Sequence, residues 1–425
     1  MLEVSFSVPK FIFVIILTTG CFAFLTYRKT IKTKLFFSLI GLFLLIYSGI
    51  GGCIVESNAF FLSYYSIYLI ILTLTIRFSP FSIHFTSDDH KKFDSYINRH
   101  GSKIVAFYLF IKVCKLIFPE FLLYRIIFPP SPDLTSFFAD LLSGDKIHPV
   151  TQLLNLITTF FIPFFYWSLY KYRKNLLLIL FFIFLDLYLG YCELAYIGRY
   201  NILFALIIIF SFILQTSSRK TRTRLIIGAL FGIPIISYMF YMYSFLRQGD
   251  SGGNIGVFDA TVYLLSQEIN YPLHFDYYKD HFNILLIDDY IEWFLFLPLP
   301  GFLKFGYGDM NLTYDFSTWV TGLAPGDTAF NVLLPGLIGE SLYVCSPSFY
   351  VFHAILLGII IKFVYKTLYN QPTLIFVFFY YAGLFSFVLN RGGTTSVYPS
   401  VMKNFLLLTL LLLYLRNHSR KRQKI

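Results

Sequence analysis

The chain has 425 residues, of which 57% are hydrophobic and only 13% are charged, and its formal net charge is +11. Soluble domains carry about a quarter charged residues, so this chain has too few to cover a water-exposed surface. The composition excludes a soluble enzyme, a secreted disulfide scaffold and a disordered chain. It predicts an all-α polytopic membrane protein, with residues 1–425 forming a single integral membrane domain.

A helix needs about 20 mostly apolar residues to cross the hydrocarbon, because every backbone polar group must be satisfied within it. Eleven stretches of the sequence meet this requirement approximately. In chain order the predicted spans are Phe11–Tyr27, Leu35–Gly52, Phe61–Ile76, Ile104–Phe118, Gln152–Tyr170, Leu176–Ile197, Ile202–Thr216, Leu225–Ser244, Phe349–Tyr365, Leu374–Leu389 and Val401–Leu415. The fourth is the weakest, because it carries Lys112 and Lys115.

Lys and Arg gather in every second connecting segment, which sets the orientation of the chain in the membrane. The basic segments are Arg28–Lys34, Arg77–Lys103, Lys171–Lys174, Arg219–Arg224, Lys362–Lys366 and Arg416–Lys424. This pattern predicts the N-terminus outside the membrane and the C-terminus inside. It also argues against a nucleic-acid partner, since the basic runs are short and separated by apolar spans.

The cysteines do not predict a disulfide framework or a metal centre. Each lies in or beside an apolar segment, and none belongs to a CxxC motif or to a Cys/His cluster. The five positions are Cys21, Cys53, Cys114, Cys192 and Cys345. They are expected to be small buried residues, and neither a metal nor a cofactor is predicted.

The segment 245–348 contains no convincing span and is predicted to form a large folded loop on the outer face. It is rich in acidic residues and has only Arg247, Lys279 and Lys304 as bases. Loops of this length are usually functional or disordered, and the frequent aromatic residues argue against disorder. Within it, Glu292–Leu303 is apolar but short and broken by proline, which predicts an interfacial or re-entrant helix. Aromatic rings and carboxylates suit a carbohydrate, but they also suit an ordinary folded loop.

Ionisable residues inside apolar spans are costly, so each one needs a partner or a function. Lys112 and Lys115 lie one turn apart on the same side of the fourth span, and Asp186 lies at a similar depth in the sixth. A structural ion pair between Lys112 and Asp186 is therefore expected.

Arginines occur beside glycines or in tight turns on the predicted outer face. Arg199 follows Gly198 between the sixth and seventh spans, Arg247 precedes a glycine-rich run, and Arg391 precedes Gly392-Gly393. Any one of them alone is as well explained by a side chain that reaches the interface. Together they indicate a shared phosphate site, since arginine stays charged and binds phosphate oxygens in pairs. Such a site could stabilise a departing lipid diphosphate without a metal ion.

The layout of most of the chain, together with a few short stretches, resembles the O-antigen polymerase (Wzy) family. Pro335-Gly336-Leu337-Ile338-Gly339-Glu340-Ser341-Leu342-Tyr343 is similar to the Gly-Glu-x-Tyr segment of that family. Arg391-Gly392 resembles its late Arg-Gly turn, and Arg199 resembles its mid-chain arginine. The sequence departs from the family after Tyr343, where Cys345-Ser346-Pro347 replaces the Phe-Gly pair that members often carry.

The resemblance implies a glycosyltransferase-type polysaccharide polymerase of the bacterial inner membrane, with a periplasmic N-terminus and a cytoplasmic C-terminus. The donor glycan would be carried on undecaprenyl diphosphate. It would be transferred to another lipid-linked repeat unit, extending the O-antigen of lipopolysaccharide or a related polysaccharide. The implied partners are this lipid-linked glycan and the lipid bilayer, with a chain-length regulator as a candidate.

Such a reaction requires a cationic site for the leaving diphosphate, a base for the attacking hydroxyl and a groove for the acceptor sugar. The predicted cationic site consists of Arg199, Arg247 and Arg391. Glu340 is the favoured base, although it could instead be a charge at a helix N-terminus. Its rivals, which could also bind substrate, are Asp250, His274 and His281. The predicted contacts in the sugar groove are Trp293, Trp319 and Tyr343.

Two alternatives remain open at this point. An O-antigen ligase would share the helices, the loop and the arginines, but it would deliver glycan to the lipid A core and typically relies on an outer-loop histidine. A polysaccharide transporter or flippase would carry charges deep along a central path and have little folded outer structure.

Overall fold

The computed structural model describes residues 7–50, 53, 59–81, 83, 85–131, 148–246, 256, 286–299, 312–323 and 334–422. Within these ranges the regular structure is helical and no β-strand occurs, which confirms the all-α prediction. The α-helices are α1 (Val8–Thr26), α2 (Ile31–Leu44), α4 (Ala59–Phe78), α5 (Ser87–Ile117), α7 (Pro149–Leu169), α8 (Leu176–Leu194), α9 (Arg199–Thr216), α10 (Arg219–Leu246), α13 (Leu286–Phe296), α14 (Leu312–Thr321), α15 (Gly336–Tyr369), α16 (Ile375–Gly383), α17 (Leu389–Gly392), α18 (Thr394–Pro399) and α19 (Leu406–Arg422). Three π-helical segments extend or join them, η1 (Leu45–Gly49), η6 (Leu384–Val388) and η7 (Ser400–Phe405).

Seven helical stretches of the described chain are long and apolar enough to cross a membrane, so the protein is a multi-pass membrane protein. They are Val8–Thr26, Ile31–Gly49, Pro149–Tyr172, Leu176–Leu194, Phe349–Tyr369, Pro372–Gly392 and Thr394–Asn417. A bent pair, Arg219–Ala229 and Pro234–Tyr243, would add an eighth. The predicted third and seventh spans correspond to the shorter apolar helices Leu62–Phe78 and Tyr200–Thr216.

Several helices extend into segments that were expected to be connections. The basic segment Arg77–Lys103 overlaps α5, which begins at Ser87 because Thr86 and Asp89 form a reciprocal capping box at its N-terminus. The basic segment Lys362–Lys366 lies wholly within α15.

Inside the predicted outer loop, α13 begins at Leu286 rather than at Glu292. In the same region α15 begins at Gly336, ahead of the predicted start at Phe349. The described part of the loop is therefore helical, in α13, α14 and the first turns of α15.

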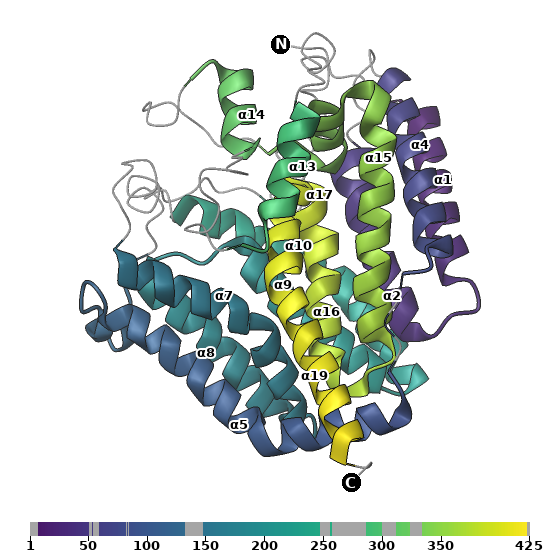
Figure 1. The fold of residues 1–425 in the computed structure, drawn as a ribbon. Helices are drawn as coiled ribbons and strands as arrows, with labels where there is room; N and C mark the ends of the chain where they lie inside the picture. The colour runs from purple at the N-terminus through teal and green to yellow at the C-terminus, as the bar shows by residue number, and fades with distance from the viewer. Residues whose placement is uncertain are drawn as a thin grey trace. The chain divides into compact units, whose positions relative to one another are not determined.

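The chain divides into two compact units. Unit 1 comprises residues 1–84, 265–370 and 381–405, and unit 2 comprises residues 85–264, 371–380 and 406–425. In unit 1, α15 packs along α4, and α1 packs against both α2 and α4 (Figure 1). Gly358 permits the close approach of α15 to α4, because a Cβ at this position would lie 2.7 Å from the Cβ of Thr75.

Basic side chains close helix C-termini at one end of unit 1. Lys32 donates to the carbonyl of Tyr369 at 2.8 Å, and Lys362 donates to the carbonyl of Ile76 at 2.7 Å. The last carbonyls of a helix have no partner within it, so a cation there satisfies both their hydrogen bonding and the helix dipole. Lys32 lies at the start of α2, and η1 extends the other end of α2 to contact α17. The turn between α17 and α18 therefore lies at the end of unit 1 opposite these lysines.

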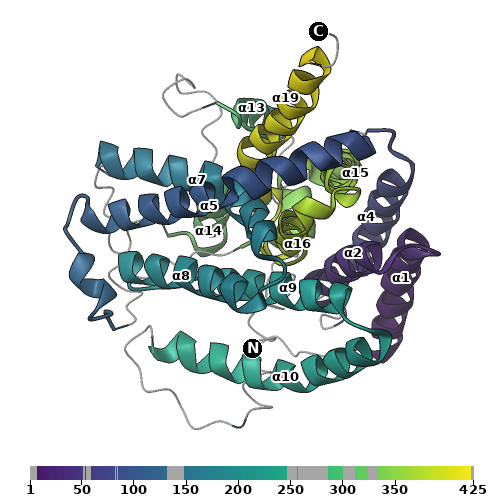
Figure 2. The same ribbon diagram turned by 90° about the horizontal axis from the view of Figure 1, so that it is seen from below.

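Unit 2 contains α5, which packs along α7 and α8 (Figure 2). Lys112 and Asp186 form an ion pair at 2.7 Å, which confirms the predicted pairing. The Tyr108 hydroxyl also donates to Asp186 at 3.0 Å. A second pair, Lys115 with Glu193 at 2.5 Å, was not predicted.

We expect removal of one member of the Lys112–Asp186 pair to be more damaging than removal of both. The side chains are only 14% and 12% exposed, so Lys112→Met leaves a nearly buried carboxylate without its cation. This change should cost about 3 kcal/mol of unfolding free energy, and Lys112→Met combined with Asp186→Leu should recover much of it. Thermal unfolding in detergent measures both effects.

The control is Lys91→Met, because the Lys91–Asp88 pair is 82% and 76% exposed. Exposed pairs contribute less than about 1 kcal/mol, so this variant should unfold close to wild type. A double variant at 112 and 186 that is no more stable than the single variant would contradict the pairing energetics.

Candidate functional site

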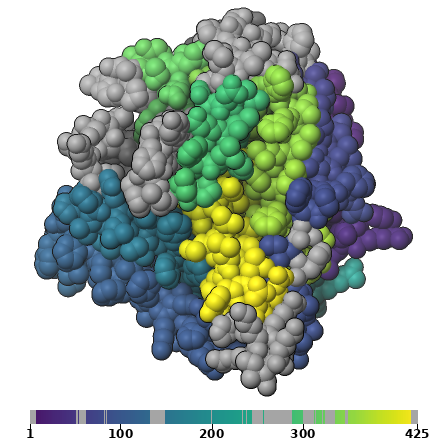
Figure 3. Space-filling view, viewed as in Figure 1, coloured from purple at the N-terminus to yellow at the C-terminus, as the bar shows by residue number. Residues whose placement is uncertain are grey.

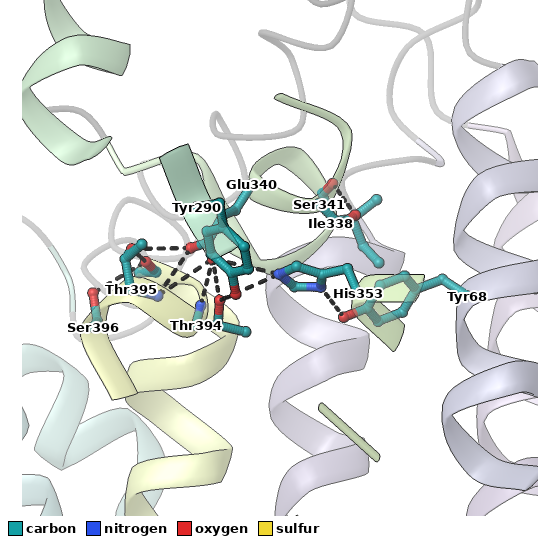
Figure 4. Close-up of polar contacts among 10 residues, drawn as sticks. Tyr68, Tyr290, Ile338, Glu340, Ser341, His353, Thr394, Thr395 and Ser396 are labelled. Carbon is teal, nitrogen blue, oxygen red and sulfur yellow. Dashed lines mark hydrogen bonds and ion pairs between the residues drawn. The ribbon is translucent and has the colours of Figure 1, made fainter. Parts of the chain in front are cut away.

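Glu340 lies in the second turn of α15, and its carboxylate binds the first residues of α18. The side chain is 0% exposed. Its Oε1 accepts the backbone N–H of Thr394 at 2.9 Å and the Thr394 hydroxyl (Figure 4). Thr395 donates its backbone N–H to Oε1 at 3.3 Å and its hydroxyl to Oε2 at 3.1 Å. Both carboxylate oxygens are therefore engaged by donors from one short helix, whose free N–H groups favour a negative charge.

Two glycines in left-handed backbone regions make this contact possible. Gly393 has φ 77° and ψ −171°, a conformation that only glycine adopts readily. A Cβ at Gly393 would lie 1.6 Å from Oε2 of Glu340. Gly336, with φ +68°, starts α15 against the backbone carbonyl of Asn390, where a Cβ would lie 3.4 Å away. The Pro335–Tyr343 segment and the turn after Arg391 thus meet because neither glycine carries a side chain.

A second layer of polar groups surrounds this contact. The Nδ1 of His353 lies 2.8 Å from the Tyr68 hydroxyl, and its Nε2 lies 3.2 Å from the Thr394 hydroxyl (Figure 4). The Tyr290 hydroxyl, from α13, also hydrogen-bonds that of Thr394. Burial raises the pKa of Tyr290 well above its ordinary value, which keeps its hydroxyl protonated.

The directions of these hydrogen bonds follow from the carboxylate. The Thr394 hydroxyl has one hydrogen, which it donates to Glu340, so it accepts from Tyr290 and from Nε2 of His353. Nε2 of His353 then carries a hydrogen, and Nδ1 hydrogen-bonds the Tyr68 hydroxyl. The same Nε2 lies 3.5 Å from Oε1 of Glu340. Thr394 and Thr395 donate directly to the carboxylate, and Tyr290 and His353 bind it through the Thr394 hydroxyl.

The other side of Arg391 is fixed by Asn390. This buried side chain donates from Nδ2 to the carbonyls of Ser386 at 2.6 Å and Phe385 at 3.4 Å. Both carbonyls belong to η6, where the helix is widened into π geometry. Arg391, in the last turn of α17 and partly exposed, therefore lies between two anchored stretches of backbone.

The predicted aromatic contacts also gather in unit 1. Trp293 is buried, with its ring 5.5 Å from that of Tyr290 and stacked 6.5 Å from that of Tyr398. Trp319, in α14, lies 5.6 Å from the ring of Tyr343. The surface of α13 directly adjoins that of α15 (Figure 3). Trp319 is the most exposed of the three predicted groove residues, so it has the most ring surface to offer a sugar.

The structure brings together half of the predicted site residues. Those in unit 1 are Glu340, Arg391, Trp293, Trp319 and Tyr343. Arg199 begins α9 in unit 2, and the structure does not describe its side chain. The remaining candidates, Arg247, Asp250, His274 and His281, lie outside the described residues. A shared site for the three arginines stays a prediction.

Several residues of the cluster were not identified from the sequence. His353 carried a usable signal, because it is an ionisable residue inside a predicted span. Tyr68, Tyr290, Thr394 and Asn390 carried none, since hydroxyl and amide side chains are common in such helices. Only the fold shows that they converge on Glu340 and on the backbone beside Arg391.

Within the described ranges, no group of three or more His, Cys, Asp or Glu side chains is placed to hold a metal ion. Comparison with protein-family models, characterised proteins and solved structures gives no match to this chain.

Replacing Gly393 by alanine should disrupt the site. The backbone conformation disfavours a side chain by about 1–3 kcal/mol, and the new Cβ would displace the Glu340 carboxylate. The expected result is a lower unfolding temperature and faster amide exchange at residues 394 and 395. The control is Gly20→Ala in α1, where a Cβ meets nothing within 4 Å. Equal behaviour of the two variants would contradict the described contact.

Proposed function

We propose that the protein is a glycosyltransferase-type polymerase of oligosaccharide repeat units carried on a lipid diphosphate, acting at the outer face of a bacterial inner membrane. Its product would be O-antigen or a related surface polysaccharide. One observation carries the proposal. The two segments that resemble the Wzy family, Pro335–Tyr343 and Arg391-Gly392, are far apart in sequence but meet through Glu340 and Thr394.

The position of the cluster supports an outer-face site. Lys32 and Lys362 mark one end of unit 1, and the Arg391 turn lies at the other end. Positive charge favours the cytoplasmic side of a membrane, so the Arg391 end is assigned to the periplasmic side. The same proposal includes eleven spans, with the N-terminus in the periplasm and the C-terminus in the cytoplasm.

The chemistry assigned to this site is attack by an acceptor hydroxyl on the anomeric carbon of the donor sugar. The new glycosidic C–O bond forms as the bond to the diphosphate breaks, undecaprenyl diphosphate departs with the electron pair, and the hydroxyl proton passes to a general base, for which Asp250, His274 and His281 are candidates. The Arg391 guanidinium binds the phosphate oxygens, whose charge grows in the transition state. Arg199 and Arg247 are proposed as further cations, and Trp319 as a ring that stacks on the acceptor sugar.

A transporter of lipid-linked glycan is the second candidate. The observation in its favour is the pair of nearly buried ion pairs in unit 2, Lys112–Asp186 and Lys115–Glu193, which place charge within the helical layer. The polymerase ranks first because the charges in unit 2 are neutralised in pairs. Arg391, by contrast, belongs to one of the two segments that resemble the polymerase family.

Deletion of the gene, followed by gel analysis of surface polysaccharide, separates the candidates. A polymerase deletion should leave single repeat units on the lipid A core and no ladder. A ligase or transporter deletion should leave no repeat units on the core, and an intact ladder would exclude all three activities.

In the complemented deletion strain, Arg391→Ala should abolish the ladder while the protein remains in the membrane at wild-type amounts. Arg391→Lys should also be defective, because lysine cannot bind two phosphate oxygens with a planar fork. Gels give the ladder and immunoblots give the amount of protein. The control is Arg99→Ala, an exposed arginine of α5. A full ladder in Arg391→Ala would remove this residue from the site.

A further inference from the structure

We infer that Glu340 is a positioning residue that fixes Arg391, and that the proton acceptor of the reaction is a different group. This assignment rests on the proposed function and concerns the same site. It replaces the base role favoured from the sequence with a role that the contacts of the carboxylate support.

A general base must have a lone pair that the attacking hydroxyl can reach. Glu340 is 0% exposed, and four donors from Thr394 and Thr395 already engage its two oxygens. An acceptor sugar would have to displace these donors to reach either oxygen.

The partners of Glu340 are donors to its oxygens. Two of them are backbone N–H groups, which can only donate, so Glu340 acts here as an acceptor. The N-terminus of α18 further favours the anion. A carboxylate engaged in this way is suited to anchoring backbone, and poorly placed to receive the proton of an acceptor hydroxyl.

The anchoring acts on Arg391 from both sides. Glu340 fixes the backbone of Thr394 and Thr395 after the arginine, and Asn390 fixes the carbonyls of η6 before it. Only Gly392 and Gly393 separate Arg391 from Thr394. The Ser396 hydroxyl also donates to the carbonyl of Gly392 at 3.0 Å, so the backbone that carries Arg391 is fixed on both sides.

His353 is a second positioning residue by the same geometry. Its Nε2 donates to the Thr394 hydroxyl, which in turn donates to Glu340, and Tyr68 fixes the ring through Nδ1. The ring is fully buried, so it supports the turn without meeting the substrate.

The first test compares pH–rate profiles of the purified protein in nanodiscs, with lipid-linked repeat units extracted from the deletion strain as substrate. Glu340→Gln should reduce kcat about 100-fold or more, because the phosphate-binding group is misplaced. It should keep the acidic limb of the profile, which reports the true base. Loss of that limb would show that Glu340 is the base and overturn the inference.

A second pair of variants covers the case in which Glu340→Gln folds poorly. His353→Gln keeps an N–H donor where Nε2 stood, whereas His353→Leu removes it. We expect the glutamine variant to retain most of the activity and the leucine variant to lose it. Equal loss in both variants would indicate that the imidazole itself takes part in proton transfer, and would overturn the positioning role.

Hydrogen–deuterium exchange supplies a readout that does not depend on activity. Peptides covering residues 391–396 should exchange faster in Glu340→Gln than in wild type, and Glu120→Gln, an exposed control in unit 2, should leave them unchanged. Unchanged exchange in Glu340→Gln would contradict the anchoring. Failure of the wild-type protein to extend the glycan would refute the proposed function instead, and the exchange result would still decide the anchoring.

Discussion

A buried carboxylate that ties two distant segments together is the interaction on which the candidate site depends. An isolated charge is very costly in an apolar interior, and breaking a buried set of partners costs several kcal/mol. Glu340 avoids this cost by taking the unsatisfied amides of α18 as partners. The same amides would otherwise be unsatisfied at the start of a helix. The carboxylate and the amides therefore satisfy each other's hydrogen bonding. This contact fixes the backbone of the turn after Arg391.

Charged side chains hydrogen-bond to helix ends at both ends of unit 1. At one end, lysines donate to the last carbonyls of α15 and α4, and at the other a carboxylate accepts from the first amides of α18. Both satisfy helix ends with side chains of the opposite charge. The placement agrees with a bilayer whose inner side prefers positive residues. These three charged side chains of unit 1 therefore each satisfy the end of a helix.

The sequence was sufficient for the fold class and for one buried ion pair. Apolar length alone predicted the helices, and matching depth predicted that Lys112 would meet Asp186. Helix limits were less accessible, because α15 begins at Gly336 rather than at Phe349 and continues past Tyr365 to Tyr369. Glu340 was recognised as a charge that could serve a helix N-terminus. That it serves α18 rather than α15 is a tertiary fact, since no local pattern links residues 340 and 394.

The π geometry of η6 has a consequence for how the arginine is aimed. A π turn accommodates one residue more than an α turn, and this surplus lies in Leu384–Val388, directly before Asn390 and Arg391. Each residue of a helix advances about 100° around its axis. Regular α geometry over the same residues, with none removed, would rotate everything downstream by about that angle. The guanidinium would then face another side of the bundle, although every chemical group of the site would still be present.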